Sequence, residues 1–220
     1  IIAMDPNRGD VKAWVGGIDF EYFKYDHASP GTRRQVGSTF KPFVYAAALE
    51  SGMDPCTYIS GAQVRYTNLS DWTPGNSDPG EYDNYYSFSG ALSKSVNTVS
   101  VKVLELTGIK RTIALARDMG ISSELPEVPS IALGTADISL LEMVTAYSSF
   151  ANGGRRVKPR YLVSVENAAG TVVEECDYYK KKERSLSKST ASIMNEMLQN
   201  VVNEGTASRL RWKYGLNGKI

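Results

Sequence analysis

Apolar residues along the chain follow patterns that predict two strands at its beginning and two helices further on. Segments 1–5 and 11–17 are interpreted as strands, and the turn-forming residues Pro6-Asn7-Arg8-Gly9 connect them. A continuous apolar run predicts a buried helix over 38–51. Near the other end, apolar residues recur at helical spacing and predict a helix over 189–204.

The middle of the chain predicts mainly helices and loops. Ser139-Leu140-Leu141-Glu142 is a capping box, which opens a helix that ends at Asn152-Gly153-Gly154 within a mostly helical lobe over 91–154. A loop-rich insertion over 56–90 precedes this lobe, and a β-hairpin over 160–175 follows it. The fold class is therefore α/β (α+β), with a small sheet and a mostly helical lobe.

One short stretch carries candidate catalytic chemistry. Gly37-Ser38-Thr39-Phe40-Lys41-Pro42 stands directly before the apolar run of the predicted helix. Because proline is tolerated only in the first turn of a helix, Pro42 places the helix start near Ser38, at the positive end of the helix dipole. Residues three apart share a helix face, and a partly desolvated Lys41 can take the Ser38 proton. The stretch predicts a serine acyl-enzyme.

The Ser-x-x-Lys spacing by itself is weakly specific, because the chain contains it twice. Ser185-Leu186-Ser187-Lys188 precedes a predicted helix, so its serines are interpreted as N-caps. A second constellation strengthens the case for Ser38. Ser95 and Asn97 lie in a predicted loop, where a hydroxyl can relay a proton to a leaving amine and an amide can hold a substrate peptide group.

With both constellations, the chain resembles the penicillin-binding, serine-type D-alanyl-D-alanine transpeptidases, and among them the class A bifunctional enzymes. The likeness runs in order along essentially the whole chain. Beyond the two constellations, it includes the hairpin from Ile2 to Gly17, Arg33-Arg34-Gln35, Ala132-Leu133-Gly134-Thr135, Ala146-Tyr147, Phe150-Ala151-Asn152-Gly153-Gly154, Glu204-Gly205-Thr206-Ala207 and Tyr214-Gly215-Leu216-Asn217-Gly218-Lys219.

The resemblance implies catalytic roles for Ser38, Lys41, Ser95 and Asn97. Lys41 would take the Ser38 proton, Ser38 would attack the penultimate D-alanine carbonyl of a peptidoglycan stem peptide, and Ser95 would relay the proton to the leaving amine. Asn97 would hold the donor peptide and help to position Lys41. β-Lactams would leave a slowly hydrolysed acyl adduct on Ser38. In the family this chemistry takes place in the periplasm or at the cell surface, in enzymes with a membrane anchor and a preceding glycosyltransferase domain.

One family feature is absent from the sequence. The third motif, Lys-Thr-Gly or Lys-Ser-Gly on a sheet strand, binds the substrate carboxylate and supplies an oxyanion-hole donor in the family, and Gly218-Lys219-Ile220 does not match it. Losing one such donor typically costs about 2.7–4 kcal/mol. We therefore expect residues 1–220 to form a partial transpeptidase domain that has little or no activity alone. We also expect an incomplete antiparallel sheet, whose open edge near residues 1–17 pairs with a neighbouring chain or whose termini are poorly ordered.

Aromatic residues gather in the insertion. Trp72-Thr73-Pro74-Gly75-Asn76 resembles a family segment that borders the active cleft, which makes Trp72 a candidate substrate-binding residue. Alternatively, the aromatic side chains hold a long loop to the surface of the protein.

Composition excludes several other classes of function. A formal net charge of +1 gives no reason to expect binding of nucleic acid or of an anionic membrane surface. The single histidine, His27, lies in a turn-like stretch, and Cys56 and Cys176 are far apart, so neither a Ser-His-Asp triad nor a zinc site is expected. We expect no metal and no cofactor.

Two other functions stay open at this stage. A β-lactamase would need a deacylation base, and Glu196 stands in a superficially similar segment, although inside the helix predicted over 189–204. A module that binds peptidoglycan or β-lactams without turnover is the second alternative. The missing third motif favours it for this chain, whereas the intact Ser38, Lys41, Ser95 and Asn97 argue against it.

Overall fold

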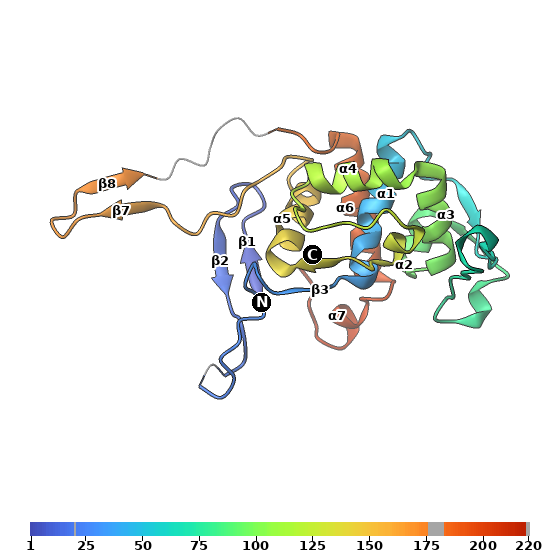
Figure 1. The fold of residues 1–220 in the computed structure, drawn as a ribbon, viewed down its shortest axis with the longest axis horizontal. Coiled ribbons are helices and arrows are strands. Elements are labelled where there is room, and N and C mark those ends of the chain that lie inside the picture. The colour runs from blue at the N-terminus through green and yellow to red at the C-terminus, as the bar shows by residue number, and fades with distance from the viewer. Residues whose placement is uncertain (20, 176–182, 219–220) are drawn as a thin grey trace. The chain divides into compact units, whose positions relative to one another are not determined.

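The computed structural model describes residues 1–19, 21–175 and 183–218, drawn as a ribbon in Figure 1. The chain passes back and forth between two compact units. The first unit consists of Ile1–Arg34, Ala116–Glu124 and Asp137–Ala191, and the second of Gln35–Leu115, Leu125–Ala136 and Ser192–Ile220. Helices alternate with short strands along the chain, which confirms the α/β (α+β) fold class.

The first unit is built on the antiparallel hairpin of β1 (Ile2–Met4) and β2 (Val11–Trp14), which lie side by side in Figure 1. These strands confirm the predicted pair, with shorter bounds. Helix α5 (Leu140–Ala151) packs against β1. A small apolar core lies here and contains Ile2, Ala28 and Leu141.

Two further pairs of short strands are present. β3 (Arg33–Gln35) pairs with β6 (Asp137–Ser139), which the sequence patterns did not predict. β7 (Ser164–Glu166) and β8 (Val172–Glu175) form an antiparallel hairpin. The hairpin predicted over 160–175 is therefore confirmed from Ser164 onward.

Arg160 lies outside the β7–β8 hairpin and instead bonds to the beginning of the chain, around β2. Its N–H donates to the Gly9 carbonyl (2.8 Å), and its own carbonyl accepts from the Val11 N–H (2.9 Å). Its guanidinium Nε donates to Asp10 Oδ1 (2.5 Å), and this hydrogen bond lowers the pKa of Asp10 to about 2. The prediction that the hairpin begins at Arg160 was wrong, because a carboxylate distant in sequence decides where this buried arginine lies.

The carboxylate of Glu142 joins the start of α5 to a preceding loop. Ser139 and Glu142 form the predicted capping box, and α5 ends beside the predicted Asn152. Glu142 Oε1 also accepts from the N–H groups of Ser122 and Ser123 (both 2.8 Å), and the hydroxyls of these serines donate to the carboxylate (both 2.7 Å). Burial raises the pKa of Glu142, but hydrogen bonds from the three serines outweigh it and lower the pKa to about 2.

We expect Glu142→Gln to lower the free energy of unfolding by about 2–3 kcal/mol at pH 7, because the amide group would leave serine donors without an acceptor. The folded-state pKa is depressed, so the contribution of Glu142 is present above about pH 4.5 and is lost as the pH falls towards 2. Urea unfolding of both proteins at pH 7 and pH 2.5 measures this difference. Glu174→Gln in the exposed β8 is the control, and an equal loss at both pH values for Glu142→Gln would contradict the prediction.

The second unit surrounds α1 (Lys41–Glu50), which follows a 3-10 turn over Gly37–Phe40. Every residue of α1 except Glu50 is buried, as expected for a central helix. Pro42 stands in its first turn, and Gly52, with φ +89°, follows its end. The predicted helix over 38–51 is confirmed, with a 3-10 start.

Other helices pack around α1. α2 (Phe88–Ser93) places Phe88 edge-on against Tyr45, with ring centroids 4.6 Å apart, and α3 (Asn97–Thr107) lies beside α1. The remaining helices are α4 (Ile109–Asp118), α6 (Lys188–Asn203) and α7 (Arg209–Trp212), together with a 3-10 turn over Pro129–Leu133. α6 confirms the helix predicted over 189–204. α3, α4 and α5 lie within the range predicted as one helical lobe, 91–154, but this range is divided between the two units, so it does not form a single lobe.

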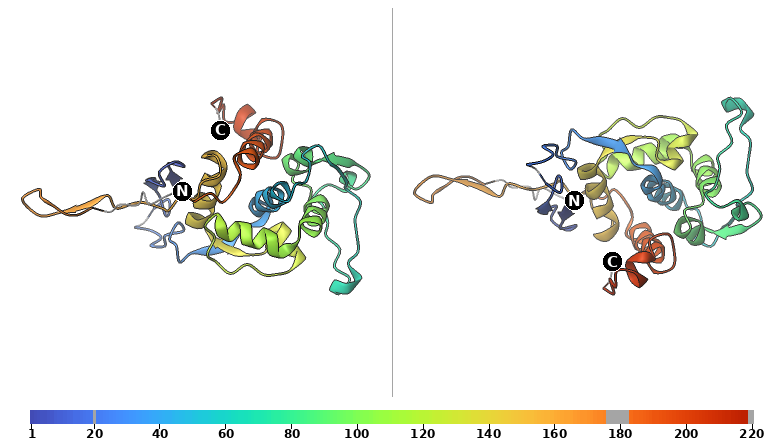
Figure 2. Two further views of the ribbon diagram at one scale, coloured as in Figure 1. Left: turned by 90° about the horizontal axis from the view of Figure 1, so that it is seen from above. Right: turned by 90° about the horizontal axis from the view of Figure 1, so that it is seen from below.

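The insertion over 56–90 is closed by a strand pair that was not predicted. β4 (Tyr58–Ser60) pairs antiparallel with β5 (Tyr85–Ser87). Between them the chain forms 3-10 turns over Thr67–Leu69 and Pro79–Glu81, and Figure 2 shows this segment in teal along the edge of the second unit. The two strands have three residues each and no short turn joins them directly, so neither a periodic pattern nor a hairpin turn marks them in the sequence.

Candidate active site

A contact between two glycine backbones sets the position of the turn that holds Ser38. Gly37 has φ +55° and donates its N–H to the Gly134 carbonyl (3.0 Å). Gly134 has φ +73°, and a Cβ added to it would stand 1.9 Å from the Gly37 carbonyl oxygen. The backbones can approach this closely only because residue 134 has no side chain.

Ser38 presents two unused polar groups at the start of α1. Its carbonyl accepts from the Lys41 N–H, which closes the turn and places both residues on one face. Ser38 is exposed. Among residues 1–19, 21–175 and 183–218, none hydrogen-bonds with its hydroxyl or its N–H. The hydroxyl is thus available as a nucleophile and the N–H as a donor to a developing oxyanion.

The side chain of Lys41 is fully buried and points at the connection between α2 and α3. Its Nζ donates to the Ser95 carbonyl (2.5 Å), to Ser95 Oγ (2.9 Å) and to Asn97 Oδ1 (2.7 Å). Burial lowers the pKa of Lys41 to about 8, against the opposing effect of the Glu81 charge. Near that pH, about half of the Lys41 side chains are neutral, as a general base requires.

The three contacts of Lys41 differ in how they handle a proton. The Ser95 carbonyl and Asn97 Oδ1 can only accept hydrogen bonds, so they orient two N–H groups of the lysine. Ser95 Oγ can also donate. A neutral Lys41 can therefore direct its lone pair at the Ser95 hydroxyl, and a proton can pass between these residues without movement of heavier atoms.

Ser95 occupies a strained backbone position. Its φ of +59° lies in the left-handed region that serine rarely adopts. The turn is held by hydrogen bonds from the Ser95 N–H to the Leu92 carbonyl (3.0 Å) and from the Val96 N–H to the Ala91 carbonyl (2.9 Å). This conformation turns both oxygens of Ser95 towards Lys41.

Asn97, the first residue of α3, is held from two sides. Lys41 donates to its Oδ1, and its Nδ2 donates to the Gly75 carbonyl (2.7 Å). The next loop residue, Asn76, hydrogen-bonds with Thr98. Gly75, Asn76 and Thr98 were not recognised as part of the site from the sequence. The available signal for Gly75 and Asn76 was their place at the end of the Trp72-Thr73-Pro74-Gly75-Asn76 segment, and Thr98 had none.

Trp72 itself does not join this group. Its ring packs on Tyr66, with ring centroids 5.5 Å apart, and its backbone bridges that residue. In the described part of the chain, no hydrogen bond or ring contact links Trp72 with Ser38, Lys41, Ser95 or Asn97. This placement agrees with the alternative that the aromatic side chains hold the loop, and substrate binding by Trp72 stays a prediction.

Glu81 contributes a charge that the sequence did not reveal. It ends the 3-10 turn over Pro79–Glu81, whose start is capped by the Asp78 side chain. Burial and the Asp78 charge raise the pKa of Glu81, whereas Lys41 and Lys94 lower it. Its charge favours the protonated form of Lys41.

The second Ser-x-x-Lys of the chain has none of these features. Ser187 Oγ accepts from the Thr190 N–H (3.1 Å) at the start of α6, which confirms that it is an N-cap. Lys188 is exposed, whereas Lys41 is fully buried. Burial of the lysine, rather than the spacing, separates the two motifs.

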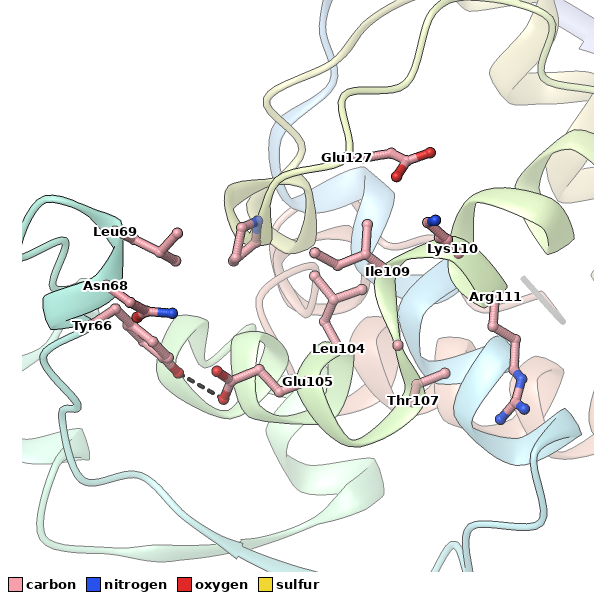
Figure 3. Close-up of a pocket in the computed structure, with 12 residues that line it drawn as sticks. Tyr66, Asn68, Leu69, Leu104, Glu105, Thr107, Ile109, Lys110, Arg111 and Glu127 are labelled. Carbon is pink, nitrogen blue, oxygen red and sulfur yellow. Dashed lines mark hydrogen bonds between the residues drawn. The ribbon is translucent and has the colours of Figure 1, made fainter.

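A pocket at the far end of α3 offers no comparable chemistry. Figure 3 shows Leu69, Leu104 and Ile109 in its lining, beside the hydrogen bond from the Tyr66 hydroxyl to Glu105 (2.8 Å). None of the four candidate catalytic residues lines this pocket. The Tyr66–Glu105 contact fastens the insertion to α3.

Known proteins with similar sequences share a domain type. A family model described as the penicillin binding protein transpeptidase domain matches residues 1–219. Penicillin-binding protein 1A of Neisseria meningitidis is 37% identical over 215 residues, which cover 94% of this chain and 27% of that protein. Penicillin-binding protein 2D of Bacillus subtilis is 30% identical over 246 residues, which cover 99% of this chain and 35% of that protein. The chain thus spans about a quarter to a third of the length of these curated relatives.

Solved structures with a similar fold include penicillin-binding protein 1A from Haemophilus influenzae, at a TM-score of 0.87 and 23% identity. That match covers 96% of this chain and 37% of the other. PonA1 from Mycobacterium tuberculosis has a TM-score of 0.80 at 22% identity, and the match covers 92% of this chain and 55% of PonA1. These similarities confirm the predicted fold.

Proposed function

Because the chain belongs to the transpeptidase domain family of class A penicillin-binding proteins, we propose that it cross-links peptidoglycan by D-alanyl-D-alanine transpeptidation through an acyl-enzyme on Ser38. The observation that carries this proposal is the buried Lys41, which contacts Ser95 and Asn97 and lies one turn after the exposed Ser38. A lysine in water would be almost fully protonated at neutral pH and could not act as a base.

Acylation begins when the amine of neutral Lys41 rotates, so that its lone pair turns from Ser95 to Ser38 and takes the proton of the Ser38 hydroxyl. Ser38 Oγ then forms a bond to the penultimate D-alanine carbonyl carbon of a stem peptide, and the Ser38 N–H donates to the oxyanion. The peptide bond breaks, and its nitrogen leaves as the amine of free D-alanine with a proton that passes from Lys41 through Ser95. An ester on Ser38 remains.

Deacylation repeats these steps with a second stem peptide. Its amine attacks the ester carbonyl and gives up a proton through Ser95 to Lys41, while Ser38 Oγ leaves and takes a proton from Lys41. The new amide bond is the cross-link. Asn97 still has one N–H on Nδ2 beyond its bond to Gly75, and this group would hold the carbonyl of the donor peptide.

β-Lactams are the second class of ligand that we propose for the site. Solved relatives of similar fold include a penicillin G acyl-enzyme complex of penicillin-binding protein A and a complex of PonA1 with penicillin V, both from Mycobacterium tuberculosis. A β-lactam carbonyl would acylate Ser38 as the stem peptide does, and its opened ring would stay attached and hinder attack by water or an amine.

Incubation of the protein expressed from its complete gene with benzylpenicillin should add the mass of one penicillin. Peptide mapping should place the adduct on Ser38. The chain supplies its own control, because the peptide with Ser185, Ser187 and Lys188 should stay unmodified, as should the protein unfolded in urea. An adduct at another residue, or no adduct on the folded protein, would refute the proposal.

Following the adduct over time, and incubating the same protein with a stem peptide, separate the alternatives. Rapid return to the unmodified mass with release of hydrolysed penicillin would indicate a β-lactamase. A stable adduct without release of D-alanine from a stem peptide would indicate a binding module. Release of D-alanine together with a cross-linked product is the outcome that we expect.

We place this reaction outside the cytoplasmic membrane, where peptidoglycan lies. Among the described residues, no helix is both long and apolar enough to cross a bilayer. Pairing of the β1–β2 edge with a neighbouring chain stays a prediction, as does the low activity of residues 1–220 alone. Comparing acylation of this chain with acylation of the complete gene product tests the second of these.

A further inference from the structure

We propose that Asn76 is a positioning residue for the reaction: it caps α3 from the insertion and thereby holds Asn97 and Ser95 against Lys41. The inference rests on the proposed function, since it concerns the residues given catalytic roles there. Within the described part of the chain, no hydrogen bond joins Asn76 to Lys41 or Ser38, so Asn76 acts through Thr98 and through its neighbour Gly75.

Helix α3 starts without a cap from its own sequence. Its N-cap residue is Val96, whose side chain offers no hydrogen-bond acceptor. Asn76 Oδ1 instead accepts from the Thr98 N–H (3.0 Å), although the two residues are 22 positions apart. The cap of α3 is therefore a contact between two segments that are distant in sequence.

The side chain of Asn76 is itself held at both ends. Its Nδ2 donates to Thr98 Oγ1 (3.1 Å), and that hydroxyl donates to the Gly61 carbonyl (2.8 Å). The backbone N–H of Asn76 donates to the Tyr82 hydroxyl (3.0 Å). These contacts leave Asn76 little freedom to turn away from the helix.

The neighbouring Gly75 transmits this restraint to the reacting groups. Its carbonyl accepts from Asn97 Nδ2, which leaves Oδ1 as the end of the amide that faces Lys41. If Gly75 moved, the Asn97 amide could rotate and present an N–H to the lysine instead. Two adjacent loop residues thus hold two adjacent helix residues in register.

The rest of the insertion is fastened along the same helix. Lys102 Nζ donates to the carbonyls of Ser60 (2.8 Å) and Ala62 (2.7 Å). The Tyr66 hydroxyl donates to Glu105, and Figure 3 shows this hydrogen bond. The insertion also carries Glu81, the charged group that acts on Lys41. The environment of Lys41 therefore depends on where the insertion lies.

The test measures the second-order rate constant of acylation by benzylpenicillin as a function of pH, in the protein expressed from its complete gene. Asn76→Ala should slow acylation by about 10- to 100-fold. The midpoint of the pH–rate profile should move upward. A loosened start of α3 lets water reach Lys41, which raises the pKa of Lys41 towards its ordinary value. The matched control is Asn167→Ala, which removes a loop asparagine that accepts from the N–H groups of Ala169 and Thr171 in the first unit and should leave both quantities unchanged.

A second pair of variants keeps the inference testable if Asn76→Ala does not fold. Thr98→Val removes the hydroxyl between Asn76 and Gly61 at nearly constant volume, and should slow acylation by about 3- to 10-fold with the same upward shift. Thr98→Ser retains the hydroxyl, so its acylation rate and its pH midpoint should match those of the protein without substitutions.

A purely structural role would lower the melting temperature without moving the pH midpoint of the folded protein. An unmoved midpoint in Asn76→Ala, or in Thr98→Val when the first variant is unfolded, would overturn the inference. If the protein without substitutions is not acylated at all, the proposed function is wrong. If it is acylated but the midpoint does not move in the variants, only the role of Asn76 is wrong.

Discussion

Replacing Lys41 with methionine should slow benzylpenicillin acylation by about 10²- to 10⁴-fold, the range typical for loss of a general base. Methionine has a similar length and lacks the nitrogen that receives the Ser38 proton. The unchanged protein should acylate faster as the pH rises, with a midpoint near 8, because the neutral form of Lys41 is the reactive one. In Lys41→Met this midpoint should disappear.

The same substitution should change the folding free energy little at pH 7, within about 1.5 kcal/mol, because two effects oppose each other. Removing the lysine relieves the desolvation cost of a buried charge, which a pKa of about 8 places at about 3 kcal/mol. It also leaves Asn97 and the oxygens of Ser95 without their shared donor, which costs about 1–3 kcal/mol. Loss of acylation in a protein of nearly unchanged stability would assign Lys41 to the reaction.

The pH dependence of stability provides a separate check. The folded-state pKa of Lys41 lies below its ordinary value of 10.5, so between about pH 8 and 10.5 the unfolded chain binds more protons than the folded one. The unchanged protein should therefore gain stability across this window, and Lys41→Met should lack that gain. Lys188→Met, in the exposed second motif, is the control and should leave both acylation and this gain intact. A Lys41→Met protein that keeps its acylation rate would remove the lysine from the mechanism.

Local patterns were sufficient where the relevant contacts are close in sequence. Ser38 and Lys41 are three residues apart, and Pro42 places the helix that carries both. The capping box of Ser139 and Glu142 is likewise confined to one helix turn. In such cases helix geometry decides which groups meet, and the sequence contains all of the information that is needed.

Contacts between distant segments could not be predicted in this way. Lys41 meets Ser95 and Asn97 across 54 and 56 positions, and the motifs pointed to this meeting only through the resemblance to a family. Asn76 was marked only by its place in the segment from Trp72 to Asn76 that resembles the family, because a loop residue that bonds to a helix elsewhere has no characteristic spacing. Glu81, which acts on Lys41 through its charge, left no signal.

The strand pairs escaped prediction for a related reason. β3 with β6 and β4 with β5 join segments of three residues that lie far apart along the chain, so they have no hairpin turn to mark them, unlike β1–β2 and β7–β8. These pairs nevertheless matter for the site, since the β4–β5 pair closes the insertion that carries Asn76 and Glu81.

Replacing Gly134 with alanine should slow acylation of Ser38 by about 10²-fold or more and lower the free energy of unfolding by about 2–5 kcal/mol. The added Cβ would lie 1.9 Å from the carbonyl oxygen, 2.5 Å from the carbonyl carbon and 2.6 Å from the nitrogen of Gly37. All three are backbone atoms, so no side chain can rotate away to make room. The turn of Ser38 must move, and with it the hydroxyl that should face Lys41.

Part of the stability loss has a different origin, because Gly134 has φ +73° and alanine is disfavoured there whatever the available space. Gly170→Ala isolates this part: Gly170 has φ +77° in the β7–β8 turn, and a Cβ added to it would meet no atom within 4 Å. It should cost about 1–2 kcal/mol and leave acylation unchanged. Acylation rates per folded molecule, measured well below both melting temperatures, give the comparison. If the two variants acylated equally fast, the contact between Gly134 and Gly37 would not determine the position of Ser38; a slower rate in Gly134→Ala alone would show that the nucleophile depends on a residue with no functional group of its own.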